Sequence, residues 1–287
     1  MSELAASFEE HRAHLVRVAY GQLGSLAEAE DVVQDAWLRL QRADASEIRD
    51  LRAWLTTTVS RLALDALRSA RTRRERYVGP WLPEPLVGDH AADPADRVTL
   101  DESVGMALLV VLESLSAGER VAFVLHDVFG YAFDEVAQVL GTSSDAARQY
   151  ASRARRHVEA RRPRFPATPE QQREIVEAFA TATAEGDMGR LVALLHPDVV
   201  MLTDGGGKLN APRKPIEGAE RVATATIALA RKGADPATLQ FVEVNGMPGI
   251  AGRDWDGTPN VVAFTVDGGL ITAIHIVRNP DKVRGIG

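Results

Sequence analysis

The sequence predicts a multidomain fold in which two all-α domains precede one α+β domain. Apolar residues recur at helical spacing through residues 7–77 and again through 104–162. Prolines and acidic residues interrupt this spacing between the two stretches, and after residue 165 short β-rich runs bounded by glycine alternate with helices. A chain of 287 residues has room for two or three domains. We therefore expect domains at 1–77, 104–164 and 165–287, with a linker at 78–103.

The composition excludes several classes of protein. The apolar share of 45% and the charged share of 25% are ordinary for a globular chain. Apolar runs stay well short of the ~20 residues that span a bilayer, and the first residues lack the basic start and apolar core of a secretory signal. Cysteine is absent, which excludes disulfides and cysteine zinc sites. We expect a cytoplasmic protein with no membrane contact, metal or other cofactor.

The charge distribution indicates two nucleic-acid surfaces. The net charge of −7 argues against indiscriminate binding to DNA, but local fields matter more than the total. Residues 146–164 hold seven arginines against one acid, Glu159, and a second arginine-rich stretch runs from Arg61 to Arg76. Two cationic helices on an acidic chain are typical of a protein that contacts promoter DNA at two places.

In the first domain, one predicted helix has a buried stripe and an acidic outer face. The stripe has the i, i+3, i+4, i+7 spacing and consists of Val32, Val33, Ala36, Trp37 and Leu40. The opposite face carries Asp31, Gln34 and Asp35. A further helix follows Asp50 and continues into the arginine-rich stretch.

The segment 79–86 is predicted to be extended, because it has three prolines in eight residues. The acidic residues that follow it indicate a solvated linker. Trp81 and Leu82 are unusual in such a linker, since exposed apolar side chains generally have a docking partner.

The second helical domain contains a predicted helix-turn-helix. Ser116 and Glu119 form a capping-box pattern, a helix over 133–140 ends at Gly141, and the next helix begins around Ser143. On this last helix Arg148, Gln149, Ser152 and Arg153 share an outer face and can read base edges in a major groove. Phosphate contacts are expected from Arg155, Arg156, Arg161 and Arg162.

The last domain reads as helices followed by an antiparallel meander, which predicts an α+β fold. Helices are expected over 168–185, where Thr168 begins a Thr-x-x-Gln cap, and over 218–232, with a short helix between them. The predicted strands are 199–203, 239–244, 250–253, 260–266 and 270–277.

Several motifs in one order resemble the extracytoplasmic-function (ECF) sigma factors, the promoter-recognition subunits of bacterial RNA polymerase. The motifs are Gly24-Ser25, the run from Ala29 to Arg39, Ala53-Trp54-Leu55 and the helix-turn-helix. The resemblance implies a region 2 domain at 7–77 and a region 4 domain at 104–162. The implied partners are promoter DNA and the polymerase core, bound through its β′ clamp helices and β flap.

The resemblance also implies roles for individual residues. Asp31, Gln34 and Asp35 match the contacts with the β′ clamp helices. The residues expected to capture a flipped base of the −10 element are Ser60, Arg61, Asp65 and Arg68, while Arg71, Arg73, Arg74 and Arg76 would contact phosphates. The expected −35 readers are Arg148, Gln149, Ser152 and Arg153.

Residues 165–287 resemble the SnoaL-like branch of the NTF2-like fold, a cone that one subgroup of ECF sigma factors carries and that is thought to regulate them. Three motifs support this: Trp81-Leu82-Pro83-Glu84-Pro85, Asp204-Gly205-Gly206-Gly207-Lys208 and Asn279-Pro280-Asp281-Lys282. Because the apolar linker motif needs a partner, we expect these residues to have a docking role, in which the C-terminal domain contacts region 2 and the Pro-rich linker. A separate anti-sigma protein is not strictly implied, and the cone could hold a small ligand.

Two other classes stay open. One is a helix-turn-helix regulator with a ligand-sensing domain. The other is a SnoaL-type enzyme with a DNA-binding leader, for which the acid–base candidates are Asp204, His196, Asp198 and His275. We expect no catalysis, because the sequence shows neither a Ser-His-Asp order nor a metal-ligand cluster, and its three glycines do not precede a helix as a phosphate loop requires.

Overall fold

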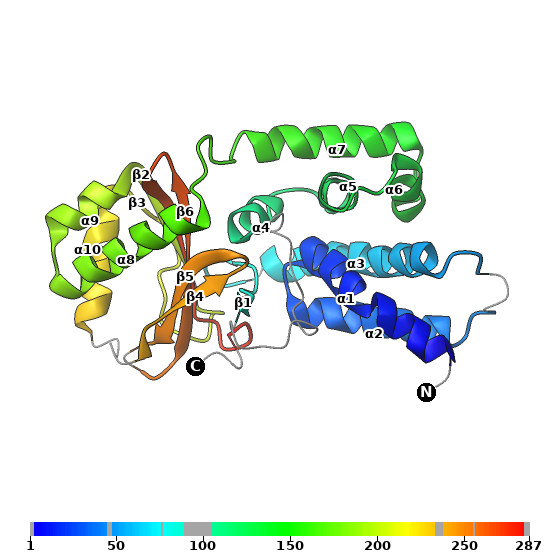
Figure 1. Ribbon diagram of the computed structural model, residues 1–287, viewed down its shortest axis with the longest axis horizontal. Helices are drawn as coiled ribbons and strands as arrows, with labels where there is room; N and C mark the ends of the chain where they lie inside the picture. The colour runs from blue at the N-terminus through cyan, green and yellow to red at the C-terminus, as the bar shows by residue number, and fades with distance from the viewer. Residues whose placement is uncertain are drawn as a thin grey trace. The chain divides into compact units, whose positions relative to one another are not determined.

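The computed structural model describes residues 3–44, 48–75, 77–88, 105–232, 238–254 and 256–283, without the side chains of residue 3 and of 70–75. It consists of two compact units (Figure 1). Unit 1 comprises Met1–Glu75, Asp93–Val104 and Leu108–Arg161, and unit 2 comprises Arg76–Ala92, Gly105–Ala107 and Arg162–Gly287.

Unit 1 begins with three helices that pack on one another: α1 (Glu3–Leu23), α2 (Leu26–Leu40) and α3 (Leu51–Glu75). The Ser25 hydroxyl caps α2 by accepting a hydrogen bond from the Glu28 amide at 3.3 Å. The predicted stripe of α2 is buried except at Trp37, which is half-buried against Phe8 with ring centroids 4.9 Å apart. The periodicity of the sequence therefore placed the inner face of this helix correctly.

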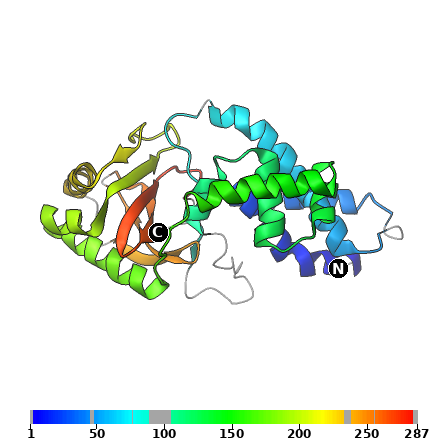
Figure 2. The ribbon, with the colours of Figure 1, turned by 90° about the horizontal axis from the view of Figure 1, so that it is seen from above.

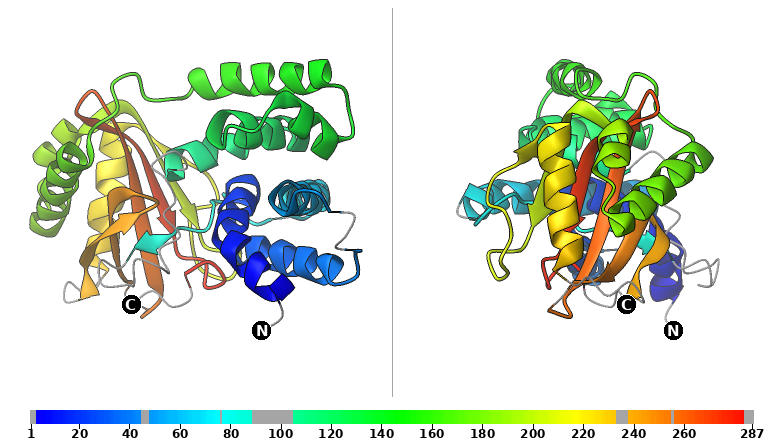
Figure 3. Two further views of the ribbon diagram at one scale, coloured as in Figure 1. Left: turned by 45° about the vertical axis from the view of Figure 1, so that its right-hand side comes forward. Right: turned by 90° about the vertical axis from the view of Figure 1, so that its left-hand side faces the viewer.

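The rest of unit 1 is built from α4 (Met106–Leu112) beyond Ala107, α5 (Ala117–Phe123), the π-helical turn η3 (Val124–Val128), α6 (Phe133–Leu140) and α7 (Ser144–Glu159). The Ser116–Glu119 capping box is present, α6 ends at Gly141 with a φ of 64°, and Ser143 caps α7. Helix α7 packs on α5 and α6 (Figure 3), so the helix-turn-helix is confirmed.

Unit 2 is an α+β domain whose helices α8 (Pro169–Glu185), α9 (Met188–Leu194) and α10 (Ala219–Arg231) cover one face of a sheet (Figures 1 and 2). The strand order is β1-β4-β5-β6-β7-β2-β3. The predicted meander is confirmed for β4 (Gln240–Val244), β5 (Met247–Arg253), β6 (Pro259–Asp267) and β7 (Leu270–Val277).

Three features of the sheet differ from the expectation. Strand β2 (Leu195–Asp204) is longer than predicted and runs parallel to β7. Strand β3 (Ile216–Glu217) was not predicted. Strand β1 (Val87–Gly88) comes from the expected linker and pairs with β4. Strands of two residues carry too little periodicity to be recognised in a sequence.

The core of unit 2 lies between its helices and its sheet. Phe264 and Ile274 project from the sheet toward Phe179 and Leu191 of the helices, and the two phenylalanine rings meet edge to face at 5.3 Å. Apolar side chains line this interior. The α+β class that the sequence predicted for this domain is confirmed, with three helices on one face of a single sheet.

Candidate functional site

Residues Tyr77–Gly88, here called the strap, belong to unit 2 and pack on its domain. Leu82 has no exposed surface, and Pro83 and Pro85 are buried as well. Prolines cannot donate backbone hydrogen bonds, so the strap is tied at its other residues. The Leu86 amide and carbonyl pair with the Asn245 side-chain oxygen at 3.1 Å and amide at 2.8 Å. The apolar residues of the linker thus have a partner within their own chain.

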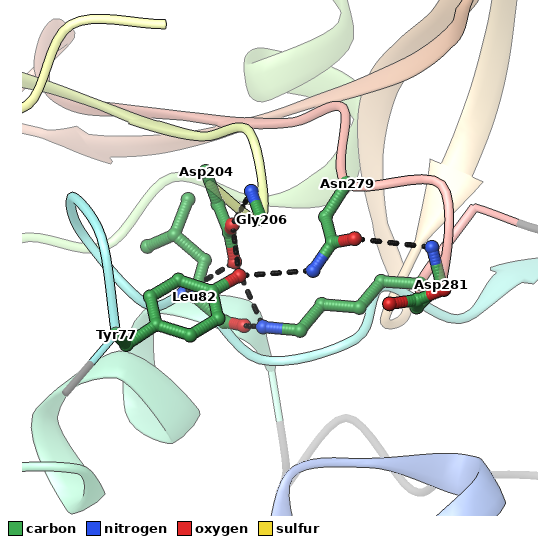
Figure 4. Close-up of polar contacts among 7 residues, drawn as sticks. Tyr77, Leu82, Asp204, Gly206, Asn279 and Asp281 are labelled. Carbon is green, nitrogen blue, oxygen red and sulfur yellow. Dashed lines mark hydrogen bonds and ion pairs between the residues drawn. The ribbon is translucent and has the colours of Figure 1, made fainter. Parts of the chain in front are cut away.

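The strap meets the domain at the fully buried carboxylate of Asp204, the last residue of β2 (Figure 4). One carboxylate oxygen accepts hydrogen bonds from the Tyr77 hydroxyl at 2.5 Å and the Gly206 amide at 2.9 Å. The other accepts from the Leu82 amide at 3.0 Å and the Lys282 ammonium at 2.8 Å. These four donors compensate the burial of a negative charge.

Lys282 connects the third motif to the strap. Its ammonium group also donates to the Leu82 carbonyl and lies 3.8 Å from the centroid of the Trp81 ring. Its side chain is only 10% exposed. A cation on an aromatic face gains electrostatic stabilisation that increases with desolvation. Trp81, Leu82 and Asp204 therefore enclose the positive charge of Lys282 from different sides.

Asn279 completes the network, because its amide donates to the Tyr77 hydroxyl at 2.9 Å (Figure 4). Its side-chain oxygen accepts from the Asp281 amide at 3.1 Å, across the turn that contains Pro280. Burial, followed by the hydrogen bond to Asp204, raises the pKa of Tyr77 above its ordinary value. Tyr77 therefore stays a neutral donor.

The glycines of the second motif allow the loop to approach Asn279 and the strap. Gly206 has a φ of 70°, and a Cβ there would lie 2.5 Å from the Asn279 side-chain oxygen. Gly207 has a φ of 67°, and its Cβ would lie 3.0 Å from Val78 of the strap. A Cβ on Gly205 would lie 2.8 Å from that of Ala211. Lys208 is peripheral, since its ion pair with Asp281 is about half exposed.

On α7, three of the arginines expected to contact DNA form ion pairs with acidic side chains of the same unit. Arg148 pairs with Asp145 at 2.7 Å, Arg153 pairs with Glu119 at 2.9 Å, and Arg155 pairs with Asp127. Exposed ion pairs contribute at most about 1 kcal/mol, so phosphates can replace such partners. Gln149, Ser152 and Arg156 are exposed and have no side-chain partner among the described residues.

The expected −10 residues of α3 occupy three different environments. Ser60 is fully buried and accepts a hydrogen bond from the Gln22 side chain at 3.0 Å, so we remove it from the DNA surface. Arg61 is exposed and donates to the Gln138 carbonyl at 2.7 Å. Asp65 and Arg68 form an exposed pair at 3.5 Å. Helix α3 continues over Arg71, Arg73 and Arg74, whose side chains lie outside the described part, and Arg76 lies outside it altogether.

On α2, Asp31, Gln34 and Asp35 are all exposed on the face opposite the buried stripe. They have no intramolecular partner among the described residues. An uncompensated acidic strip of this kind is available to a basic partner.

Comparisons with known proteins agree with this arrangement. Sigma-70 region 2 matches residues 7–73, and Sigma-70 region 4 matches residues 105–158. The ECF RNA polymerase sigma factor SigJ of Mycobacterium tuberculosis is 44% identical, over 98% of this chain and 93% of that protein. The chain belongs to the ECF sigma factors. In the crystal structure of that SigJ, 98% of each chain matches with a TM-score of 0.82 and 41% identity. The probable ECF sigma factor SigI of the same species is 37% identical over 98% of this chain.

Two residues that matter to the strap site of this sigma factor were missed by the sequence analysis. Tyr77 was assigned to the end of the first domain. Arg278 is 4% exposed, and its guanidinium contacts Asp254 at 2.8 Å, Asp256 at 3.0 Å and the Asn210 carbonyl at 2.9 Å. Arg278 directly precedes Asn279 and thereby fixes the third motif. The sequence did contain a signal for Arg278, because an arginine at the end of an apolar strand is expected to have an acidic partner.

The acid–base candidates of unit 2 occupy separate environments. Burial lowers the pKa of His275 to about 4, and this ring projects from the sheet on the side opposite Ile274 and Ile276. His196 accepts a hydrogen bond from the Asp198 amide within β2, where the pairing with β7 shifts register. Among the described residues there is no group of three His, Cys, Asp or Glu that could hold a metal, and no helix long and apolar enough to cross a membrane.

Proposed function

We propose that the SnoaL-like domain of this sigma factor controls promoter use by holding the strap. The chain directs promoter-specific initiation by RNA polymerase, because it is an ECF sigma factor with both region 2 and region 4. The strap lies between these regions along the chain and begins two residues after Glu75, the last residue of α3. A domain that binds the strap therefore acts on the segment that joins the two DNA-binding regions.

The buried Asp204 carboxylate is the observation that carries this proposal. Two of its four donors, the Tyr77 hydroxyl and the Leu82 amide, belong to the strap. Removing the strap would leave a buried carboxylate and the Lys282 ammonium with fewer partners, which is costly in free energy. The network therefore favours two conditions, strap bound or strap released, over intermediate ones.

The DNA and polymerase surfaces are proposed as follows. Asp31, Gln34 and Asp35 bind the β′ clamp helices, and region 4 binds the β flap. Arg148, Gln149 and Ser152 read −35 base edges, while Arg153, which the Glu119 carboxylate holds toward α5, joins the phosphate contacts. The proposed phosphate contacts of α7 are Arg153, Arg155 and Arg156. The residues proposed to capture and hold the −10 strand are Arg61, Asp65, Arg68, Arg71, Arg73 and Arg74. With these contacts the protein would act beside the polymerase in the cytoplasm.

Run-off transcription with purified core polymerase tests the control by the strap. Asp204→Asn removes the charge at the centre of the network, whereas Lys208→Ala removes an exposed ion pair of the same loop. Release of the strap should raise transcript yield from a cognate promoter with Asp204→Asn, while Lys208→Ala matches the wild type. Equal yields from all three proteins would end the regulatory proposal.

Charge reversal on α2 distinguishes a sigma factor that binds the polymerase from a helix-turn-helix regulator that acts without it. Asp31→Lys with Asp35→Lys should abolish co-purification with core polymerase, because the clamp helices would meet like charge. A regulator that acts without polymerase contacts would keep its activity. A catalytic role receives no support from the described residues, since the Asp204 carboxylate is occupied by donors from the strap and by Lys282.

A further inference from the structure

A small polar pocket lies in unit 2 where the strap meets the loop that follows β2. Its volume is about 120 Å³. The lining comes from the strap, from the end of β2 and from the loop, and consists of Val78, Gly79, Thr203, Gly205, Gly207 and the segment 209–213. These residues do not belong to the apolar core between the helices and the sheet, so the pocket is separate from the interior of the domain.

Glycines of the second motif keep this pocket open. A Cβ on Gly205 would lie 2.8 Å from that of Ala211, and a Cβ on Gly207 would lie 3.0 Å from that of Val78. Both neighbours line the pocket. Gly207 also has a φ of 67°, which L residues with a side chain rarely adopt. Side chains at these two positions would therefore push into the walls of the pocket.

The charge of the pocket comes from Arg213. It is the one ionisable residue among the described residues of the lining, which contains no acid. Its side chain is exposed, and its guanidinium has no partner among the described residues. A guanidinium with unused donors binds carboxylates and phosphates in a bidentate manner. The lining therefore favours an anion.

Thr203 contributes a buried hydroxyl to the same pocket. The residue is only 6% exposed, yet its hydroxyl forms no hydrogen bond with any residue that the structure describes. Buried polar groups are ordinarily hydrogen-bonded, because leaving them unpaired costs free energy. The Gly207 amide likewise has no partner in the described part of the chain. A hydroxyl and an amide can both donate to an oxyanion.

The volume limits the size of the ligand. Sites for drug-sized molecules measure roughly 300–1,000 Å³, which is well above the 120 Å³ found here. A phosphate or carboxylate group with few attached atoms has a suitable size. A nucleotide or a large aromatic metabolite does not.

The strap supplies one wall of the pocket and packs on the loop at two points. Val78 faces Gly207, and a Cβ on Gly79 would lie 3.8 Å from the Arg213 Cα. Release of the strap would remove this wall. A ligand that binds the strap-bound state more tightly shifts the equilibrium toward that state, by as much as its affinities for the two states differ. An anion in the pocket therefore stabilises the bound strap.

We infer that this pocket is an effector site for a small oxyanion, the phosphate or carboxylate group of a metabolite. Arg213, Thr203 and the Gly207 amide bind the anion, and the anion holds the strap in place. The consequence for transcription rests on the proposed function, under which the anion lowers promoter use. The site itself does not depend on that function.

Hydrogen-exchange mass spectrometry of the full-length protein tests the site. Inorganic phosphate and acetate are the two probes, and chloride at equal ionic strength is the reference. A probe that binds only the strap-bound state should slow the exchange of residues 77–88 roughly tenfold at ten times its Kd, and the effect should saturate. Protection by phosphate alone identifies a phosphate group as the ligand, and protection by acetate alone identifies a carboxylate.

Two neighbouring substitutions provide the matched comparison. Arg213→Gln removes the charge that lines the pocket, whereas Lys214→Gln removes an exposed charge outside the lining. The first should abolish the protection and the second should retain it. Both positions are exposed, and circular dichroism verifies that both variants are folded. Equal protection in the two variants, or no saturable protection of the wild type by either probe, overturns the inference.

A variant with a weakened strap separates this inference from the proposed function. Asp204→Asn should bind phosphate more weakly than the wild type in isothermal titration calorimetry, because coupling between two sites is reciprocal. Unchanged affinity would overturn the link between the pocket and the strap. Equal run-off transcription from Asp204→Asn and the wild type, with strap protection by a probe intact, contradicts the proposed function and leaves the effector site standing.

Discussion

The strap site of unit 2 and the interface between regions 2 and 4 in unit 1 are both intramolecular contacts, but they use different interactions. In the strap site a buried carboxylate accepts four hydrogen bonds and pairs with a nearly buried lysine. At the interface the Tyr131 hydroxyl of region 4 lies 2.6 Å from the His14 ring and 3.2 Å from the Thr56 hydroxyl of region 2. The exposed Arg61 guanidinium donates to a backbone carbonyl of α6, and Gly21 allows α1 to approach η3 closely. Breaking the first leaves a charge without partners, whereas water can solvate the groups freed by the second. The strap site is therefore the stronger of the two contacts.

The largest effect is expected from Asp204→Ala. The substitution leaves the Lys282 ammonium buried without its carboxylate, and breaking a buried ion pair costs ~3–5 kcal/mol. Amide hydrogens of residues 77–88 should exchange much faster, as measured by hydrogen-exchange mass spectrometry. Lys208→Ala should change their protection by less than about 1 kcal/mol, because its ion pair is exposed. Equal protection in the two variants would show that the carboxylate does not hold the strap.

A smaller effect is expected from Gly206→Ala, with Gly257→Ala as its control. Both glycines have positive φ, so both substitutions introduce backbone strain of ~1–3 kcal/mol. Only at Gly206 would the new methyl group meet another side chain, that of Asn279, whereas nothing lies within 4 Å of the methyl group at Gly257. Thermal unfolding should show Gly206→Ala to be the less stable by a further ~1–3 kcal/mol. Identical losses would mean that the Asn279 contact is unimportant.

Tyr77→Phe and Tyr131→Phe each remove one hydroxyl, so the free energies that they cost compare the strap site with the interface. Tyr77→Phe removes a hydrogen bond to a carboxylate, worth ~1.5–3 kcal/mol, while Tyr131→Phe removes bonds between neutral groups, worth ~0.5–1.5 kcal/mol. Hydrogen exchange of the strap measures the first loss. The chain has no cysteine of its own, so a bis-maleimide can join cysteines introduced at Thr57 on α3 and Gln138 on α6 while the interface is closed. The cross-link yield of this Thr57→Cys/Gln138→Cys variant, with and without Tyr131→Phe, measures the second. A larger loss from Tyr131→Phe would reverse the order that we assign to the two contacts.

The smallest effect is a pH dependence confined to the interface. Burial, followed by the positive fields of Arg52, Arg17 and His11, lowers the pKa of His14 from 6.5 to about 4. These groups lie on α1 and α3, and region 4 adds only the neutral Tyr131 hydroxyl, so a protonated His14 would meet no anion among them. Only the burial that region 4 adds to His14 is linked to closure, so this contribution is fully present above pH 6.5 and weakens as the pH falls from 6.5 toward about 4.

Energy transfer between dyes on the Thr57→Cys/Gln138→Cys pair measures this pH dependence. Closure should weaken over that range in the parent protein and be independent of pH with His14→Gln. A pH profile unchanged by His14→Gln would assign the titration to another group.

Much of the local architecture could be read from the sequence. The α2 stripe, the Ser116–Glu119 capping box, the left-handed turn at Gly141 and the cap at Ser143 all depend on residues within one or two turns of each other. The meander of unit 2 followed from alternating runs and glycine turns for the same reason. The three motifs that meet at the strap were also found in the sequence, although only as separate segments.

Contacts between distant residues were decided by the tertiary structure. Tyr77 and Asn279 are 202 positions apart and share one hydrogen bond, and Tyr131 and His14 are 117 positions apart. Ser60 looked available to DNA, but the packing of α1 and α3 buries it against Gln22. Helical period, caps and turns depend on neighbouring residues and can be read along the chain. The partner of a buried charge depends on which surfaces the folded chain brings together, and no local pattern records that choice.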